Sequence, residues 1–158
     1  SSDLSMTSYA PLLAKDRRTR WRPDLIYFNN MEVKPGTSYY TQLLFGQNSG
    51  NEHISSVLTL SDNRDDVRKR IGISVVKDSL SQDLILKIVN LLPVKVQATI
   101  DLAPLGITGK QDATKTVLSG MPDDWKARPG TSSIAIAPQF RDELPAYSLT
   151  VVRLKSKP

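Results

Sequence analysis

The clearest pattern in the chain is a strict alternation of apolar and polar residues near its middle. Between Val94 and Asp101, two valines, an alanine and an isoleucine alternate with lysine, glutamine, threonine and aspartate. A period of two predicts a strand with one buried face and one solvated face. The preceding stretch, Asp83–Leu91, is almost entirely apolar, which is typical of a central strand buried on both faces.

Comparable short apolar runs predict five further strands. They lie at residues 54–60, 68–77, 114–118, 133–137 and 147–155. With the first two they make seven predicted strands, and turn signals separate them. This arrangement favours a mainly β fold, an antiparallel β-sandwich.

One helix is predicted ahead of the β region, at Thr37–Phe45. Its Tyr40, Leu43 and Leu44 are spaced i, i+3 and i+4, so they fall on a single apolar stripe. The glycine that follows can take the left-handed conformation that ends a helix.

A boundary is expected just after this helix. A polar loop follows it, and the pattern changes there from helical to alternating. A chain of 158 residues fits one domain, or one domain plus a fragment. We therefore expect residues 1–49 to form one part and residues 50–158 to form a β-sandwich domain.

Composition excludes several kinds of chemistry. The chain has no cysteine, so it has no disulfide, no thiol nucleophile and no cysteine-ligated metal. His53 is the only histidine, and as a general base it would need a nucleophile and an orienting group nearby, so a surface histidine is favoured over a Ser-His-Asp triad. One histidine and no cysteine also argue against a zinc site. Asp62–Asp66 is rich in oxygen ligands, but Arg64 lies in its middle, so a plain turn is favoured over a calcium site. No metal and no cofactor are expected.

The net charge of +5 does not indicate a nucleic-acid partner. Two basic clusters, Lys15–Arg22 and Arg64–Arg70, are both interrupted by aspartates, which favours solvated surface over a phosphate-binding patch. No apolar run approaches the length of about 18 residues needed to span a membrane. Neither nucleic acid nor membrane is therefore an expected partner.

A pair of catalytic carboxylates is also not evident. Glycoside hydrolysis usually needs two carboxyl groups that face each other across the scissile bond. The three glutamates, Glu32, Glu52 and Glu143, all lie next to turns in segments with no reason to converge.

One stretch, Trp21–Asn30, has the residue types of a sugar-binding wall. Trp21 can stack on a sugar ring, and Asp24, Asn29 and Asn30 can hydrogen-bond hydroxyl groups of a small polar ligand. The alternative is that Trp21 and the apolar run after it belong to the core, with the asparagines in a turn. Residue types alone favour this alternative.

Four blocks of the sequence resemble the C-terminal part of the α-L-arabinofuranosidases of glycoside hydrolase family 51. They are Ser8–Leu13, Trp21–Asn30, Thr37–Phe45 and Leu144–Leu154, and their order and spacing match that family. The resemblance implies a retaining enzyme in which a (β/α)₈ barrel is joined to a C-terminal β-sandwich of jelly-roll type. The fold expected here is then a jelly-roll sandwich with a short N-terminal remnant of the barrel.

The resemblance assigns residues 1–49 to the end of the catalytic barrel. Tyr9–Leu13 would be the last barrel strand and Ser38–Phe45 the last barrel helix. The stretch Trp21–Asn30 would lie in the loop between them, and such loops build the active-site face of a barrel enzyme. Trp21, Asp24, Asn29 and Asn30 thereby become candidate substrate-binding residues.

The resemblance places the acid/base and nucleophile glutamates upstream of residue 1. No catalytic residue is then expected in this chain, which would be inactive alone. The parent enzyme, meaning the longer protein of which the chain would be a part, is expected to hydrolyse terminal α-L-arabinofuranosyl residues from arabinose-containing polysaccharides. It is expected to be secreted or periplasmic.

The expected partners follow from the same resemblance. They are the catalytic barrel of the same full-length chain and, through it, the polysaccharide. In the family, the sandwich also takes strands from the start of the full chain, so an open edge or apolar face is expected here. It would be covered by the barrel remnant or by a homodimer.

Two other functions are considered. An independent carbohydrate-binding sandwich would need an aromatic platform, for which the β region offers only Trp125, Phe140 and Tyr147. A basic nucleic-acid binder is the third possibility, and only weak binding is expected of it.

Overall fold

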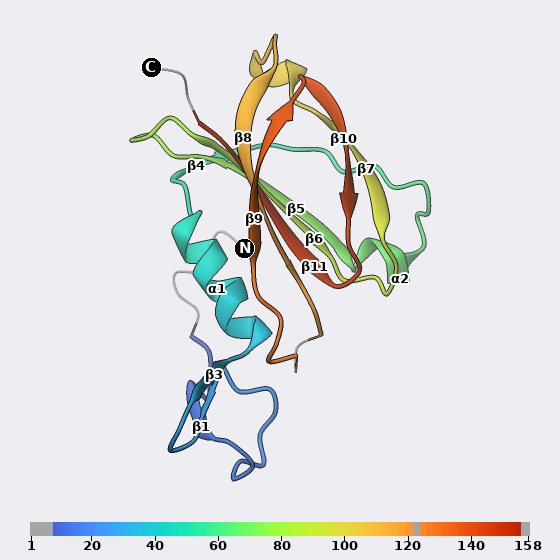
Figure 1. The fold of residues 1–158 in the computed structure, drawn as a ribbon. Helices are drawn as coiled ribbons and strands as arrows, with labels where there is room; N and C mark the ends of the chain where they lie inside the picture. The colour runs from blue at the N-terminus through green and yellow to red at the C-terminus, as the bar shows by residue number, and fades with distance from the viewer. Residues whose placement is uncertain (1–7, 122–123, 156–158) are drawn as a thin grey trace.

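The computed structural model describes residues 8–121 and 124–155, so the first seven residues of the predicted N-terminal part lie outside the described residues. Three short strands and a helix come first, and the longer strands follow (Figure 1). The elements are β1 (Leu13–Lys15), β2 (Ile26–Phe28), β3 (Val33–Pro35), α1 (Thr37–Gln47), β4 (Glu52–Ile54), α2 (Asp65–Arg68), β5 (Ile71–Lys77), β6 (Leu84–Asn90), β7 (Val96–Asp101), the 3-10 helix η1 (Ala103–Leu105), β8 (Gln111–Ser119), β9 (Gly130–Ile136), β10 (Gln139–Leu144) and β11 (Ser148–Leu154).

A six-stranded antiparallel sheet is the centre of the fold. Its strand order is β4-β5-β6-β11-β8-β9, so β6 and β11 lie in the middle. These two strands run side by side from the pair Ser148 and Asn90 to the pair Leu154 and Leu84. The prediction of a central strand at Asp83–Leu91 is confirmed.

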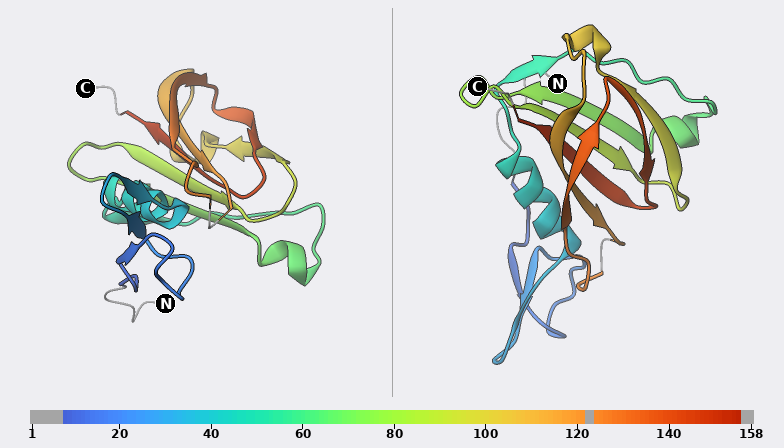
Figure 2. Two further views of the ribbon diagram at one scale, coloured as in Figure 1. Left: turned by 60° about the horizontal axis from the view of Figure 1, so that its bottom comes forward. Right: turned by 45° about the horizontal axis from the view of Figure 1, so that its top comes forward.

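A two-stranded antiparallel sheet of β7 and β10 covers one face of the large sheet (Figure 2). Apolar side chains fill the space between the layers. The buried ones are Val75, Leu86, Leu102, Ala113, Ile136, Val152 and Leu154. The alternation predicted between Val94 and Asp101 is present in β7, where half-buried residues alternate with exposed ones. The fold is thus mainly β and antiparallel, consistent with a β-sandwich.

Helix α1 covers the opposite face of the large sheet. Its Leu44 is buried in a second apolar cluster with Ile85, Leu118, Leu149 and Val151. Adjacent residues of a strand point to opposite faces, so Ile85 packs under the helix while its neighbour Leu86 packs under β7 and β10. The sheet is therefore buried on both faces.

Three local predictions are wrong. Of the strand predicted at residues 54–60, only Ile54 belongs to β4, and the chain then leaves the sheet with Val57 exposed. The helix continues through Gly46 and ends at Gln47. Its cap is Asn48, whose Nδ2 donates to the carbonyl of Leu44 at 2.9 Å, so no left-handed glycine is needed there. The turn predicted at Asp62–Asp66 contains the start of the short helix α2.

The N-terminal strands form a separate three-stranded sheet in the order β1-β2-β3. β1 pairs with β2 in parallel, and β2 pairs with β3 antiparallel. The strand predicted at Tyr9–Leu13 is shifted, since β1 begins at Leu13. The stretch Trp21–Asn30, predicted to be a loop, contains β2. The boundary placed between residues 49 and 50 lies in the connection from α1 to β4 and stays a prediction.

Candidate functional site

The N-terminal sheet positions the four predicted site residues, and it separates them into two pairs. Because β1 and β2 are parallel, the chain after Lys15 must cross back to the start of β2. Trp21 and Asp24 lie on this crossing segment, whereas Asn29 and Asn30 follow the end of β2. The two pairs thus lie at opposite ends of a three-residue strand.

Trp21 lies at the surface. Its side chain is 74% exposed, so the alternative that it belongs to the core is wrong. Its backbone is held in a tight turn, because the Trp21 N–H donates to Thr19 Oγ1 at 3.1 Å and that hydroxyl lies 3.2 Å from the Trp21 carbonyl. The indole is available for contact with a ligand.

Asp24 is fully buried, and neither of its carboxylate oxygens has a hydrogen-bond partner among the described residues. Its backbone N–H donates to the hydroxyl of Tyr27 at 2.8 Å. The hydroxyl of Tyr9 donates to the carbonyl of Pro23 at 3.0 Å and lies 3.4 Å from Ser38 Oγ, which ties this segment to the start of α1. Burying a carboxylate without a donor is costly. Asp24 therefore needs a donor that the described residues do not supply.

The asparagines lie in the turn between β2 and β3. Asn29 Oδ1 accepts hydrogen bonds from the N–H groups of Met31 and Glu32 at 2.8 and 2.9 Å. Asn29 Nδ2 donates to Glu32 Oε1 at 3.3 Å. The polar atoms of Asn29 are therefore engaged in forming the turn, while Asn30 is exposed.

Next to this turn, Lys34 bridges two carboxylates. Its Nζ lies 2.8 Å from Asp16 Oδ2 and 2.9 Å from Glu32 Oε1. The hydrogen bond from Lys34 is the main reason that the pKa of Asp16 and that of Glu32 are both lowered. A general acid of a glycosidase needs a raised pKa, so this pair lacks that property.

The start of α1 is joined to the loop between β8 and β9. Thr37 Oγ1 lies 2.9 Å from the carbonyl of Met121 and 3.0 Å from that of Asp124, and can donate to either. The guanidinium of Arg128 lies 5.1 Å from the ring centre of Tyr40. These contacts fix the N-terminal end of the helix beside the large sheet.

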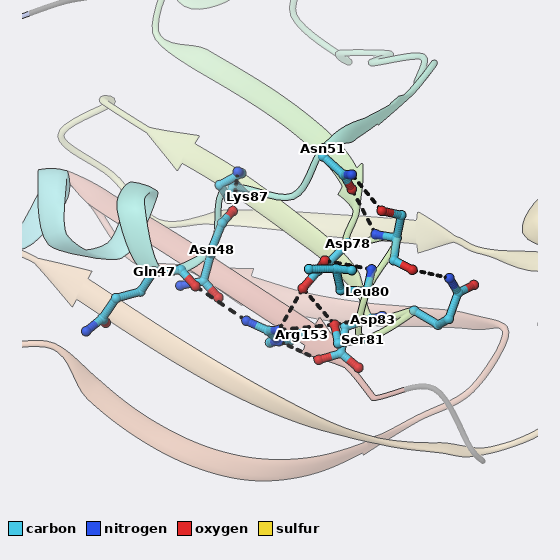
Figure 3. A network of polar contacts seen from close by, with 11 residues as sticks. Gln47, Asn48, Asn51, Asp78, Leu80, Ser81, Asp83, Lys87 and Arg153 are labelled. Carbon is cyan, nitrogen blue, oxygen red and sulfur yellow. Dashed lines mark hydrogen bonds and ion pairs between the residues drawn. The ribbon is translucent and has the colours of Figure 1, made fainter.

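The C-terminal end of α1 is held by two cations from the middle strands of the sheet (Figure 3). Lys87 is only 5% exposed, and its Nζ donates to the carbonyl of Asn48 at 2.6 Å. Burial lowers the pKa of Lys87. Positive charge at this end complements the helix dipole and the unpaired carbonyl groups.

Arg153 is the second cation in this network. Its Nε donates to Asp83 Oδ2 at 2.6 Å, and its Nη2 lies 3.8 Å from Asp78 Oδ2. Its Nη1 donates to the carbonyl of Gln47 at 3.4 Å. Arg153 thus links the end of α1 to the turn between β5 and β6. A hollow of about 340 Å³ lies here, lined in part by Asn51.

The sequence did not predict this network. Its contacts join residues as far apart as Gln47 and Arg153, which no local pattern reveals. One signal was present, namely a lysine in the middle of the apolar run of β6.

The three aromatic residues considered for a sugar platform do not lie together. Trp125 is in the loop after β8, with the ammonium groups of Lys34 and Lys126 at 5.3 and 5.4 Å from its ring centre. Phe140 packs against the core between the two sheets. Tyr147 lines a hollow of about 400 Å³ on the other face, beside α1.

Metal-binding and membrane-spanning features were sought in the same residues. In residues 8–121 and 124–155, no group of three or more histidine, aspartate or glutamate side chains could hold a metal ion. No helix in this part of the chain has the length and apolar character needed to cross a membrane.

Comparison with known proteins finds sequence relatives that are α-L-arabinofuranosidases. No family model matches the chain. The extracellular exo-α-L-arabinofuranosidase of Streptomyces chartreusis is 30% identical over 128 residues, which is 80% of this chain and 14% of that protein. α-L-Arabinofuranosidase 1 of Arabidopsis thaliana is 38% identical over 58 residues, which is 37% of this chain and 9% of that protein.

Known structures agree with these relatives. The arabinose-bound family 51 α-L-arabinofuranosidase MgGH51 superposes with a TM-score of 0.79 and 26% identity, covering 95% of this chain and 24% of that one. The Thermotoga maritima α-L-arabinofuranosidase, at 11% identity and a TM-score of 0.66, shares the fold over 84% of this chain and 32% of its own. The chain thus spans less than a third of the length of these proteins. From these matches, the chain belongs to glycoside hydrolase family 51, the family of α-L-arabinofuranosidases, of which it represents a part.

Proposed function

We propose that the chain is a non-catalytic part of an α-L-arabinofuranosidase that hydrolyses terminal α-L-arabinofuranosyl residues from arabinose-containing polysaccharides. Its role is to support the catalytic barrel. The observation that carries this proposal is the attachment of α1, which is fixed to the large sheet by Leu44 in its middle and by Lys87 and Arg153 at its end. A helix held so firmly can brace whatever packs around the N-terminal sheet.

We further propose that the N-terminal sheet is a remnant of the barrel. β1 would be the last barrel strand. β2, which pairs with β1 in parallel, and β3, which pairs with β2 antiparallel, would belong to the loop that follows it. The register places Leu13, Phe28 and Val33 on one face of the sheet, and all three are exposed. An apolar sheet face in water needs cover, and the upstream part of the barrel would supply it. The catalytic glutamates would lie in that upstream part.

The sandwich also has strand edges with which strands from upstream of this chain could pair. Two strands face a sheet of six, so β7 and β10 each have one edge without a strand partner among the described residues. Strand β9, at the edge of the large sheet, is likewise paired only with β8 in this part of the chain. Strands from the start of the parent enzyme would extend the smaller layer, and a homodimer through β9 is the alternative.

Within the assembled enzyme, we assign Trp21, Asp24, Asn29 and Asn30 to the substrate side of the barrel. Trp21 would stack on a sugar, and the carboxylate of Asp24, which is buried in this chain, would meet a donor only if its segment rearranges in the assembled barrel. Since the Streptomyces relative is described as extracellular, we place the parent enzyme outside the cell.

The first test measures arabinose release from an aryl α-L-arabinofuranoside. The full-length protein that contains this chain should release arabinose, whereas the purified 158-residue chain should not. Release by the chain alone would overturn the non-catalytic assignment. No release by the full-length protein would overturn the assigned activity.

The second test addresses the bracing role. In the full-length protein, Leu44→Asp places a charge in the cluster under α1 and should reduce arabinose release at least about tenfold, because a buried unpaired charge unseats the helix. Leu80→Asp makes the same change at a fully solvated turn and should leave the rate within about twofold. Equal rates for the two variants would contradict the bracing role.

A further inference from the structure

The segment that leads from β1 towards β2 carries a dense group of exposed cations. We call residues Lys15–Arg22 the arginine loop. Its five cations are all exposed: Lys15, Arg17, Arg18, Arg20 and Arg22. The loop belongs to the N-terminal sheet, which lies at the far end of the molecule from β7 and β10 (Figure 1).

The single acidic residue of this loop does not neutralise these cations. Asp16 is turned towards Lys34, whose Nζ lies 2.8 Å from its Oδ2. Arg17 adds only a smaller contribution to the lowered pKa of Asp16. Arg18, Arg20 and Arg22 have neither an ion pair nor a side-chain hydrogen bond with any described residue.

The other basic cluster of the chain behaves differently. Around α2, Arg64 pairs with Asp62 at 2.8 Å and Lys69 pairs with Asp65 at 3.7 Å. Those cations are partly neutralised by their own neighbours. The arginine loop is thus a run of exposed cations that its own neighbours neutralise less than those around α2.

Hydrogen bonds within the arginine loop fix the conformation of its backbone. The Arg18 N–H donates to the carbonyl of Lys15 at 3.0 Å, and Arg17 adopts a left-handed conformation with φ of 61°. The hydroxyl of Thr19 then closes the turn that contains Trp21. The exposed indole of Trp21 thus lies in the chain between two exposed arginines, Arg20 and Arg22.

This combination suits an acidic sugar. An indole face stacks on the C–H face of a sugar ring, and a guanidinium group binds a carboxylate through two parallel hydrogen bonds. We propose that the arginine loop binds the carboxylate groups of uronic acid residues, so that the parent enzyme favours polysaccharides bearing both arabinose and uronate. This inference rests on the function proposed above.

A nucleic acid would also be attracted by the charge, but the loop fits it less well. Binding of single strands uses several aromatic side chains on which successive bases stack. The arginine loop offers one, Trp21. A polysaccharide chain that needs one stacking residue and a few carboxylate contacts matches it better.

The test measures binding of the full-length protein to polygalacturonate, with neutral debranched arabinan as the uncharged probe. Arg18→Gln/Arg20→Gln/Arg22→Gln removes three charges from the loop. Exposed ion pairs contribute roughly 2- to 5-fold each in affinity, so this variant should bind polygalacturonate about tenfold or more weakly. Binding to arabinan should stay within about twofold.

A matched control removes three charges from the other cluster. Arg64→Gln/Arg68→Gln/Lys69→Gln makes the same change in net charge, and its binding to polygalacturonate should remain within about twofold of the unmodified protein. Trp21→Ala should weaken binding while leaving the charge unchanged. Equal losses in the two triple variants, or no loss in the first, would overturn the proposal.

Two further measurements complete the design. Tighter binding of poly(U) than of polygalacturonate at equal ionic strength would favour a nucleic-acid ligand and overturn the proposal. Arabinose release from neutral arabinan tests the parent activity separately. Release without polygalacturonate binding would overturn only the uronate inference, and polygalacturonate binding without release from any substrate would overturn only the proposed function.

Discussion

The sandwich and the N-terminal sheet differ in the length of their strands and in how far they bury their apolar side chains. The sandwich has strands of six to nine residues in its two layers, apart from the short β4, and it buries them around a continuous apolar core. The N-terminal sheet has strands of three residues and exposes much of its apolar surface. Leu86 of the first is 3% exposed, whereas Leu13 of the second is 62% exposed. The difference shows that the sandwich has an apolar core of its own, whereas the N-terminal sheet leaves large apolar side chains in solvent.

Helix α1 belongs to both regions. It begins directly after β3, and its Leu44 is buried against the large sheet. Most of the stability of a short helix comes from such tertiary packing. The position of the N-terminal sheet is therefore set by the sandwich through this helix.

The largest expected effect compares one leucine from each region. Leu86→Ala should lower the free energy of unfolding by about 2–5 kcal/mol, because it opens a cavity between the two layers. Leu13→Ala removes the same atoms from an exposed site and should change it by no more than about 0.5 kcal/mol. Urea unfolding of both variants measures the contrast, and similar losses would show that the N-terminal sheet has a core of its own.

A smaller effect is expected when the link between the regions is weakened. Leu44→Ala should loosen α1 by about 2–3 kcal/mol, which corresponds to roughly 30- to 150-fold faster amide exchange in the helix and the N-terminal sheet. The central amides of β6 and β11 should keep their protection. Exchange that speeds up equally in all four regions would mean that the chain opens as one unit. Leu80→Ala, at an exposed turn, is the matched control.

The smallest effect concerns pH and the N-terminal sheet alone. Lys34 lowers the pKa of both Asp16 and Glu32 below their ordinary values. Carboxylates of this kind stabilise the folded state above their unfolded pKa of about 4 and lose that contribution as the pH falls through the folded value.

Opening of the N-terminal sheet should therefore become easier between about pH 5 and pH 3. Lys34→Met should flatten this dependence, because both carboxylates lose their partner. NMR signals of β2 and β3 in urea, recorded across this range, measure it. Lys69→Met removes an exposed ion pair elsewhere and should leave the pH dependence of these signals unchanged.

The sequence predicts the regular parts of the sandwich well. The apolar run of β6 indicates a strand buried on both faces, and the alternation of β7 has a period of two that specifies one buried face. Strand β10 escaped prediction, because its Gln-Phe-Arg-Asp-Glu-Leu sequence has three charged residues and only two apolar ones. One of those charges, Asp142, forms an ion pair with Lys115 across the layers, which a single strand cannot reveal.

The candidate site was harder to predict, for a physical reason. Their residue types predicted that Trp21, Asp24, Asn29 and Asn30 form one site. The parallel pairing of β1 and β2 instead places them at the two ends of β2. Parallel pairing depends on a crossing connection, and nothing in the local pattern of three-residue strands signals it. The resemblance to the arabinofuranosidases predicted the family, which the hydrophobic pattern could not, because it uses the order and spacing of four sequence blocks.

The position of β11 has a consequence for how the protein is made. In the large sheet, β4-β5-β6 and β8-β9 meet only through β11, which is the last of these strands to be synthesised. Until it emerges from the ribosome, the nascent chain holds two partial sheets, each with an open edge. Such edges invite pairing with other chains, and closing a sheet by its last strand is slow. Productive folding should therefore depend on protection of the nascent chain by chaperones until the final strand is released.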